Sequence, residues 1–79
     1  MARVSETQEA AMRWADAHRT DDGEALVIAH PATERSLARK GWAVRLPAGA
    51  MILTKEGEAV VADLKERGPR ALRELLSLS

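Results

Sequence analysis

The sequence contains no cysteine and has only two aromatic residues, Trp14 and Trp42, among its 79 positions. Without cysteine, neither a disulfide nor a thiolate zinc site can stabilise the chain, and we expect it in the reducing cytoplasm. With so few aromatic rings, the core must be built mainly from Ala, Val and Leu. A chain of this length is near the size at which one hydrophobic core becomes marginal. We therefore expect a single small domain over residues 1–79, held together by helix packing.

Long apolar runs and recognisable catalytic or metal-binding motifs are also missing. No stretch approaches the ~20 apolar residues of a membrane span, and the N-terminal residues lack the apolar centre of a signal peptide. No neighbouring carboxylate or thiol completes a metal-ligand set around His18 or His30, and residues 21–24 lack the ligand spacing of a calcium loop. No phosphate-binding glycine loop occurs, and the serines have no identifiable base. We expect no membrane span, no cofactor, no metal and no enzymatic activity.

The net charge is zero, but the charges are segregated along the chain. Residues 1–24 hold three basic and six acidic residues, a net charge of −3, whereas residues 25–55 hold five basic residues against one acidic residue, a net charge of +4. Residues 56–79 hold four basic and five acidic residues, a net charge of −1. A local positive field can attract phosphate even though the whole molecule is neutral.

The first helix is predicted over residues 5–19. Ser5 and Gln8 have the spacing of a capping box, which satisfies free backbone donors of a first helical turn. The run ends in the turn-forming sequence of residues 20–23. Residues at helical spacing form one small-residue face with a tryptophan as its large anchor: Ala10, Ala11, Trp14, Ala17 and His18.

Residues 25–29 form a short apolar run bounded by Gly23 and by His30-Pro31. Five residues are too few for periodicity to separate a strand from a helical turn. Proline forces the preceding residue toward extended geometry, which favours a strand.

A second helix is predicted over residues 31–40, because Pro31 suits a first helical turn and Gly41 suits the position after the last one. If Leu37 faces the core, the opposite face of the helix carries small, polar and positively charged side chains. It consists of Ala32, Arg35, Ser36 and Arg39.

A β-hairpin is predicted next. Trp42, Val44 and Leu46 alternate with smaller or charged residues as in a half-buried strand, and residues 51–53 are its expected partner. Pro47 and Gly49 supply the turn between the two strands. Trp42 is in phase with the apolar positions, so we expect it to fill the core beneath the hairpin rather than to form a stacking platform.

A further helix is predicted from Lys55 to about Arg67, with Thr54 as its cap. Gly57 costs ~1 kcal/mol relative to Ala in a helix, so its position on the apolar face suggests close backbone contact with the hairpin. Gly68-Pro69 ends this helix. Residues 69–78 form a possible fourth helix with a stripe that can either dock on the chain's own core or form a homodimer: Leu72, Leu75 and Leu76.

The middle of the chain resembles a known family. Residues 33–43, TERSLARKGWA, followed by ILTKEG at 52–57, resemble the MarR-like and PadR-like winged helix-turn-helix regulators. The similarity covers about half of the chain. It implies a small α+β winged-helix-like domain with three to four helices and a two-stranded hairpin as the wing. Two features depart from the family pattern: the stretch from Gly23 to Pro31 is short for the first helix of the turn motif, and the wing turn at 47–50 is uncharged.

In the family, the helix that matches residues 31–40 enters the DNA major groove, and the hairpin that matches 42–54 lies along the backbone. The candidates for base or phosphate contacts are then Arg35, Ser36 and Arg39. Arginine can make two hydrogen bonds to guanine or bind phosphate, and serine can hydrogen-bond to a base or to a phosphate. Lys40 and Arg45 would contact phosphate only. The same residues also fit an ordinary solvated surface.

Two functions are consistent with these observations. The first is a small DNA-binding protein, a transcriptional regulator that acts on double-stranded DNA as a dimer. The second is a winged-helix module that binds another protein and no nucleic acid. Charge segregation and the family resemblance favour the first, whereas zero net charge and the uncharged wing turn favour the second.

Overall fold

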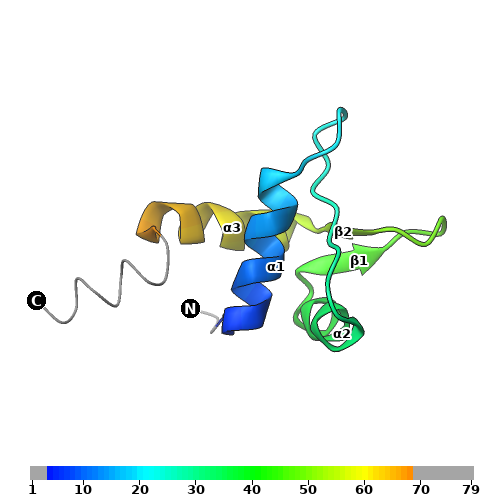
Figure 1. Ribbon diagram of the computed structural model, residues 1–79, viewed down its shortest axis with the longest axis horizontal. Coiled ribbons are helices and arrows are strands. Elements are labelled where there is room, and N and C mark those ends of the chain that lie inside the picture. Colours follow the sequence, from blue (N-terminus) through cyan, green and yellow to red (C-terminus); the bar gives the residue numbers. More distant parts are fainter. Residues whose placement is uncertain (1–3, 69–79) are drawn as a thin grey trace, which may run out of the picture.

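The computed structural model describes residues 4–68, which form a small α+β domain with three helices and a two-stranded antiparallel hairpin (Figure 1). The described elements follow the order α1 (Glu6–Ala17), α2 (Pro31–Lys40), β1 (Ala43–Arg45), β2 (Met51–Leu53) and α3 (Lys55–Arg67). This order is compatible with a winged-helix-like layout. The possible helix over 69–78, with Leu72, Leu75 and Leu76, lies outside the described residues. Among residues 4–68, no helix has both the length and the apolar character needed to cross a bilayer.

Helix α1 begins with the predicted capping box. The Ser5 hydroxyl accepts a hydrogen bond from the Gln8 backbone N–H, and the Gln8 side chain accepts one from the Ser5 N–H. Of the predicted small-residue face, Ala11 is buried, but Trp14 does not anchor the helix in the core, because it is 40% exposed. The buried face is rotated and contains Gln8, Ala11, Met12 and Ala15. Its small alanines allow α2 and α3, which both contact α1, to approach closely, whereas a tryptophan there would hold them apart.

The hairpin has the predicted strands and a third extended segment beside it. β1 pairs with β2 in the register Ala43↔Leu53, Val44↔Ile52 and Arg45↔Met51. Residues 25–27 lie along the other edge of β2: Leu26 bridges Ile52, the Val27 N–H donates to the Met51 carbonyl at 2.8 Å, and the Leu53 N–H donates to the Ala25 carbonyl at 3.1 Å. The extended geometry predicted for 25–29 is confirmed over this shorter stretch.

The alternation predicted for β1 is only partly correct. Trp42 is buried as predicted, but Ala43 is buried too and Val44 is 46% exposed. The reason is that Trp42 lies in the turn that closes α2, just before the strand, since its N–H donates to the Leu37 carbonyl. The strand pattern therefore starts one residue later, which turns Val44 outward.

Gly57, in the first turns of α3, marks the closest approach between α3 and the hairpin. A Cβ at this position would lie 2.0 Å from the Trp42 carbonyl oxygen and 3.3 Å from a methyl carbon of Leu53. No side chain fits in this gap, which confirms the predicted backbone contact. The surrounding core includes Met12 and Leu37, which are fully buried.

We expect Gly57→Ala to lower the free energy of unfolding by about 1–3 kcal/mol, because the backbone of Trp42 must move to admit the methyl group. The sign is informative, since at an open helical position the same change would raise stability by about 1 kcal/mol. Urea unfolding followed by circular dichroism measures the difference. A stabilised variant would show that the two backbones are not in contact.

Candidate nucleic-acid interface

Helix α2 has capping signals at both ends and buries one residue in the core. Pro31 occupies its first turn, the His30 side chain accepts a hydrogen bond from the Ala32 N–H at 3.1 Å, and Gly41 closes its end with φ +79°. Of its ten residues only Leu37 is buried, with no exposed surface. The far side of the helix is therefore available to solvent along its whole length.

Arg35 and Arg39 lie one turn apart on this solvent side. Both are exposed, and neither forms a hydrogen bond or ion pair with any residue between 4 and 68. The exposed neighbours Ala32 and Ala38 are small. A helix with this surface can come close to a flat or concave partner while two guanidinium groups remain free to bind acceptors.

Ser36 does not share this outward face, so its predicted orientation is wrong. Its hydroxyl accepts a hydrogen bond from the side-chain N–H of Gln8, across the contact between α1 and α2. Gln8 is 4% exposed, so its amide depends on this partner. The spacing of residues along α2 could not show that Ser36 lies on the side that contacts α1 rather than on the side that faces solvent.

We expect Ser36→Ala to destabilise the fold by about 1–3 kcal/mol, because the buried Gln8 amide loses its acceptor. The exposed control Ala32→Ser should stay within about 0.5 kcal/mol of the parent protein. Thermal unfolding measures both. Unchanged stability in Ser36→Ala would mean that the Ser36 hydroxyl is not held by α1.

Lys40 and Arg45, the two residues predicted to contact phosphate, are both engaged within the fold. The Lys40 ammonium lies 5.9 Å from the centre of the Trp42 ring, in cation–π geometry. The Arg45 guanidinium contacts a carboxylate oxygen of Glu34 at 2.8 Å and donates to the Gly49 carbonyl at 2.6 Å. Arg45 thus connects α2, β1 and the hairpin turn, and Glu34 offsets its charge.

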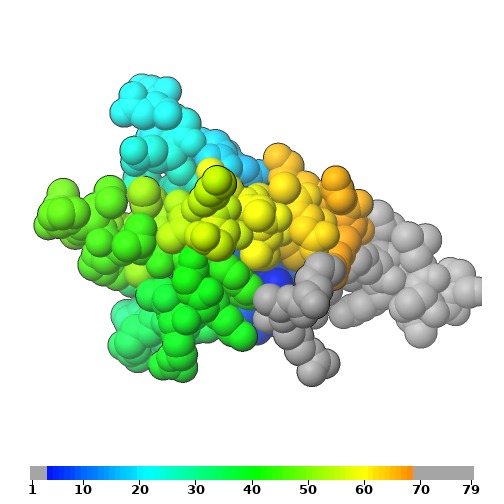
Figure 2. All heavy atoms as spheres, turned by 180° about the vertical axis from the view of Figure 1, so that it is seen from behind, coloured from blue at the N-terminus to red at the C-terminus, as the bar shows by residue number. Residues whose placement is uncertain are grey.

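A shallow depression of about 280 Å³ separates α2 from the hairpin. The hairpin turn, Pro47 to Ala50, projects from the body beside α2 (Figure 2). The depression is thus open on a surface that carries two arginines and one glutamate. Its lining residues are Pro31, Glu34, Arg35, Ala38, Arg45 and Met51.

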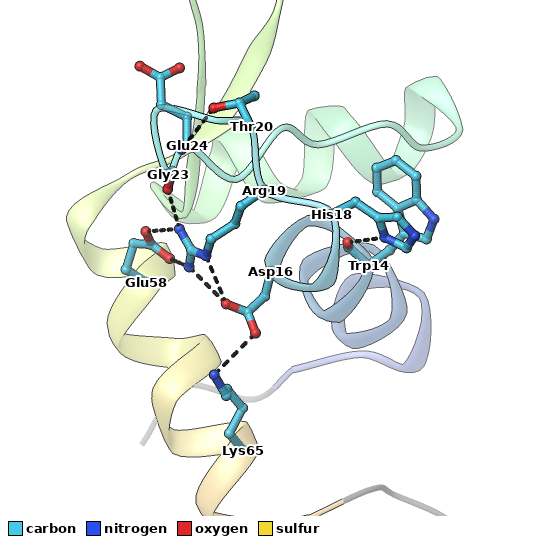
Figure 3. A network of polar contacts seen from close by, with 9 residues as sticks. All are labelled: Trp14, Asp16, His18, Arg19, Thr20, Gly23, Glu24, Glu58 and Lys65. Carbon is cyan, nitrogen blue, oxygen red and sulfur yellow. Dashed lines mark hydrogen bonds and ion pairs between the residues drawn. The ribbon is translucent and has the colours of Figure 1, made fainter.

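A second cluster of charges lies at the other end of the domain (Figure 3). The Arg19 guanidinium contacts Glu58 at 2.6 Å, Asp16 at 2.8 Å and the Gly23 carbonyl at 2.8 Å. Lys65 approaches the other Asp16 oxygen at 3.3 Å. Hydrogen bonds from Arg19 lower the pKa of Asp16, and those to Glu58 and Asp16 raise the pKa of Arg19. Each charge faces an opposite charge, so this cluster fastens α1 and the 20–23 turn to α3.

We expect Asp16→Asn to lower stability at pH 7 by more than Asp63→Asn, which removes one simple surface pair with Arg67. Because the folded pKa of Asp16 lies below 3.8, its contribution is complete above that value and is lost as the pH falls through the lower folded value. The gap between parent and Asp16→Asn should therefore close in acid. Urea unfolding at several pH values measures it, and a gap independent of pH would contradict the ion pairing.

Among residues 4–68, no group of three or more His, Cys, Asp or Glu side chains is placed to hold a metal ion. Comparison with family models, with curated proteins and with solved structures finds no match to this chain. The case for function therefore depends on the geometry of α2 and the hairpin.

Proposed function

We propose that this protein is a small regulator that binds double-stranded DNA through the solvent side of α2, with the hairpin as a wing beside it. The observation that carries the proposal is the pair Arg35 and Arg39. Both arginines are exposed, and neither has a partner within the described residues. They lie one helical turn apart between small residues, on the side of α2 away from the buried Leu37. Arginine in this setting can reach both base edges and phosphates.

The order of elements supports the same proposal. An extended segment at 25–27, a helix, a hairpin and a further helix follow α1, and the extended segment pairs with β2. Only one helix, α2, stands between that segment and β1, so the first helix of a standard turn motif is absent from the described residues. The proposed domain is a shortened winged helix in which α2 alone presents the DNA-binding face.

The expected salt dependence of DNA binding follows from how many cations near the proposed interface lack an acidic partner. Arg45 is compensated by Glu34, whereas Arg35, Arg39 and Lys40 have no acidic partner among residues 4–68. Three phosphate contacts give a slope of log K against log salt of about −2.7, which is shallow for a DNA-binding protein. One copy alone should therefore bind weakly.

A protein-binding module without nucleic-acid binding is the second candidate, and a specific observation favours it. The hairpin turn, residues 47–50, is uncharged, and the exposed large apolar residues include Ile28, which is 67% exposed. Apolar residues at the surface suit a protein partner better than a phosphate backbone.

The first candidate is tested by fluorescence anisotropy of labelled random duplex DNA in low and moderate salt. We expect binding in low salt that weakens with a log–log slope of about −2.7. Arg35→Ala with Arg39→Ala should abolish the binding, because it removes two of the three cations of α2 that have no acidic partner among residues 4–68.

The matched control is Lys65→Ala with Arg67→Ala, which changes the net charge by the same amount on the last turns of α3. It should retain the parent affinity. Equal weakening by both double variants would show that net charge, not the α2 surface, governs binding. No anisotropy change in low salt would leave the protein-binding module as the function.

A further inference from the structure

Helix α1 has a solvent face that nothing among residues 4–68 covers. Ala10, Trp14 and Ala17 are exposed at spacings of four and three residues, so they line one side of the helix. The His18 ring stacks on the Trp14 indole, with 4.3 Å between ring centres, and its Nδ1 lies 2.9 Å from the Trp14 carbonyl oxygen. Figure 3 shows both rings directed away from α3. A small domain with only two tryptophans leaves one of them 40% exposed on this face.

The end of α3 is fastened beside the same face. The Arg13 guanidinium, next to Trp14 in sequence, donates to the Leu64 carbonyl at 2.9 Å and to the Gly68 carbonyl at 2.8 Å. On a helical wheel, position 13 adjoins positions 10 and 17. Gly68, the last described residue, therefore lies next to α1, close to its uncovered side.

The backbone at Gly68 is not helical and ends α3. Gly68 has φ 80° and ψ 179°, a combination that is essentially restricted to glycine. Pro69 follows it and cannot supply a helical backbone donor. Helix α3 therefore ends at Arg67, and its C-cap Gly68 is the residue that Arg13 holds against α1.

We propose that residues 69–79 pack on α1 of the same chain, with Leu72, Leu75 and Leu76 against Ala10, Trp14 and Ala17. Leucines at spacings of three and four form a stripe that matches an apolar helix face. As a helix, residues 69–78 would be ~15 Å long, close to the ~18 Å of the twelve-residue α1. Ala10 and Ala17 leave room for leucine side chains, and Trp14 supplies the apolar area.

We favour residues 69–79 of the same chain over those of a second copy, because Gly68 already holds the start of this segment next to α1. The segment begins at a residue already bound to α1, so its effective concentration near that helix is about millimolar. A second copy must pay the entropy of association before it makes the same contacts. This inference is independent of DNA binding, since the face lies on α1 and not on the solvent side of α2.

The direct test is nuclear Overhauser spectroscopy on the full chain. Contacts between the Trp14 indole protons and leucine methyl groups of residues 72–76 should appear in a uniformly labelled sample. They should be absent from an isotope-filtered experiment on mixed labelled and unlabelled chains, which detects contacts between copies only. Contacts in the mixed sample would assign the face to a second copy and overturn the proposal. Absence of contacts in both samples would overturn it as well.

Iodide quenching of tryptophan fluorescence gives a second measurement. Leu72→Ser with Leu75→Ser and Leu76→Ser in the full chain should raise the quenching constant of the accessible tryptophan severalfold, because Trp14 becomes uncovered while Trp42 stays buried. The control Arg73→Ala with Glu74→Ala changes the opposite side of the segment, keeps the net charge and should leave quenching unchanged. Circular dichroism verifies that each variant is folded. Equal quenching in the leucine variant and the parent would contradict the packing.

Discussion

The backbone junction around Trp42 fixes the relation between α2, the hairpin and α3. The Trp42 N–H donates to the Leu37 carbonyl and its own carbonyl accepts from the Thr54 N–H, while the Thr54 hydroxyl donates to the Gly41 carbonyl at 2.6 Å. Gly57 then brings α3 against the same Trp42 carbonyl. These contacts lie within two short stretches of chain, residues 37–42 and 54–57. Because they involve backbone atoms, they hold the end of α2 at one position relative to the sheet, largely independent of nearby surface side chains.

The parts of this fold that sequence could predict are those that depend on local chemistry. Ser5, Pro31, Gly41 and Thr54 mark helix ends through hydrogen bonds or backbone angles within a few residues, and each lies where it was expected. The placement of Gly57 could also be foreseen, since a glycine that costs helical stability needs a packing reason. Local signals therefore located the elements and one of their contacts.

Orientation was harder to predict, because it depends on partners distant in sequence. Helix α1 has alanines on two faces, and the face with Ala11 and Ala15 is buried, whereas the face with Trp14 is exposed. Ser36 turns toward Gln8, twenty-eight residues away, and Arg19 reaches Glu58, thirty-nine residues away. No periodicity encodes such pairings. Of the candidate interface, Arg35 and Arg39 are exposed as expected, whereas their binding role stays a prediction.

Charges are paired in the cluster around Arg19, whereas two arginines on α2 are left unpaired within residues 4–68. Around Arg19 every cation forms an ion pair with a carboxylate, so the charges of the cluster offset one another and it exerts little electrostatic attraction on a partner molecule. On α2 the acidic residue Glu34 is engaged by Arg45, and the exposed Arg35 and Arg39 have no acidic partner among residues 4–68. A neutral protein can thus carry a locally positive surface. Because Leu37 is the one buried residue of α2, the outer positions of that helix can be randomised together without creating cavities, which makes this short chain a suitable scaffold for selecting new recognition surfaces.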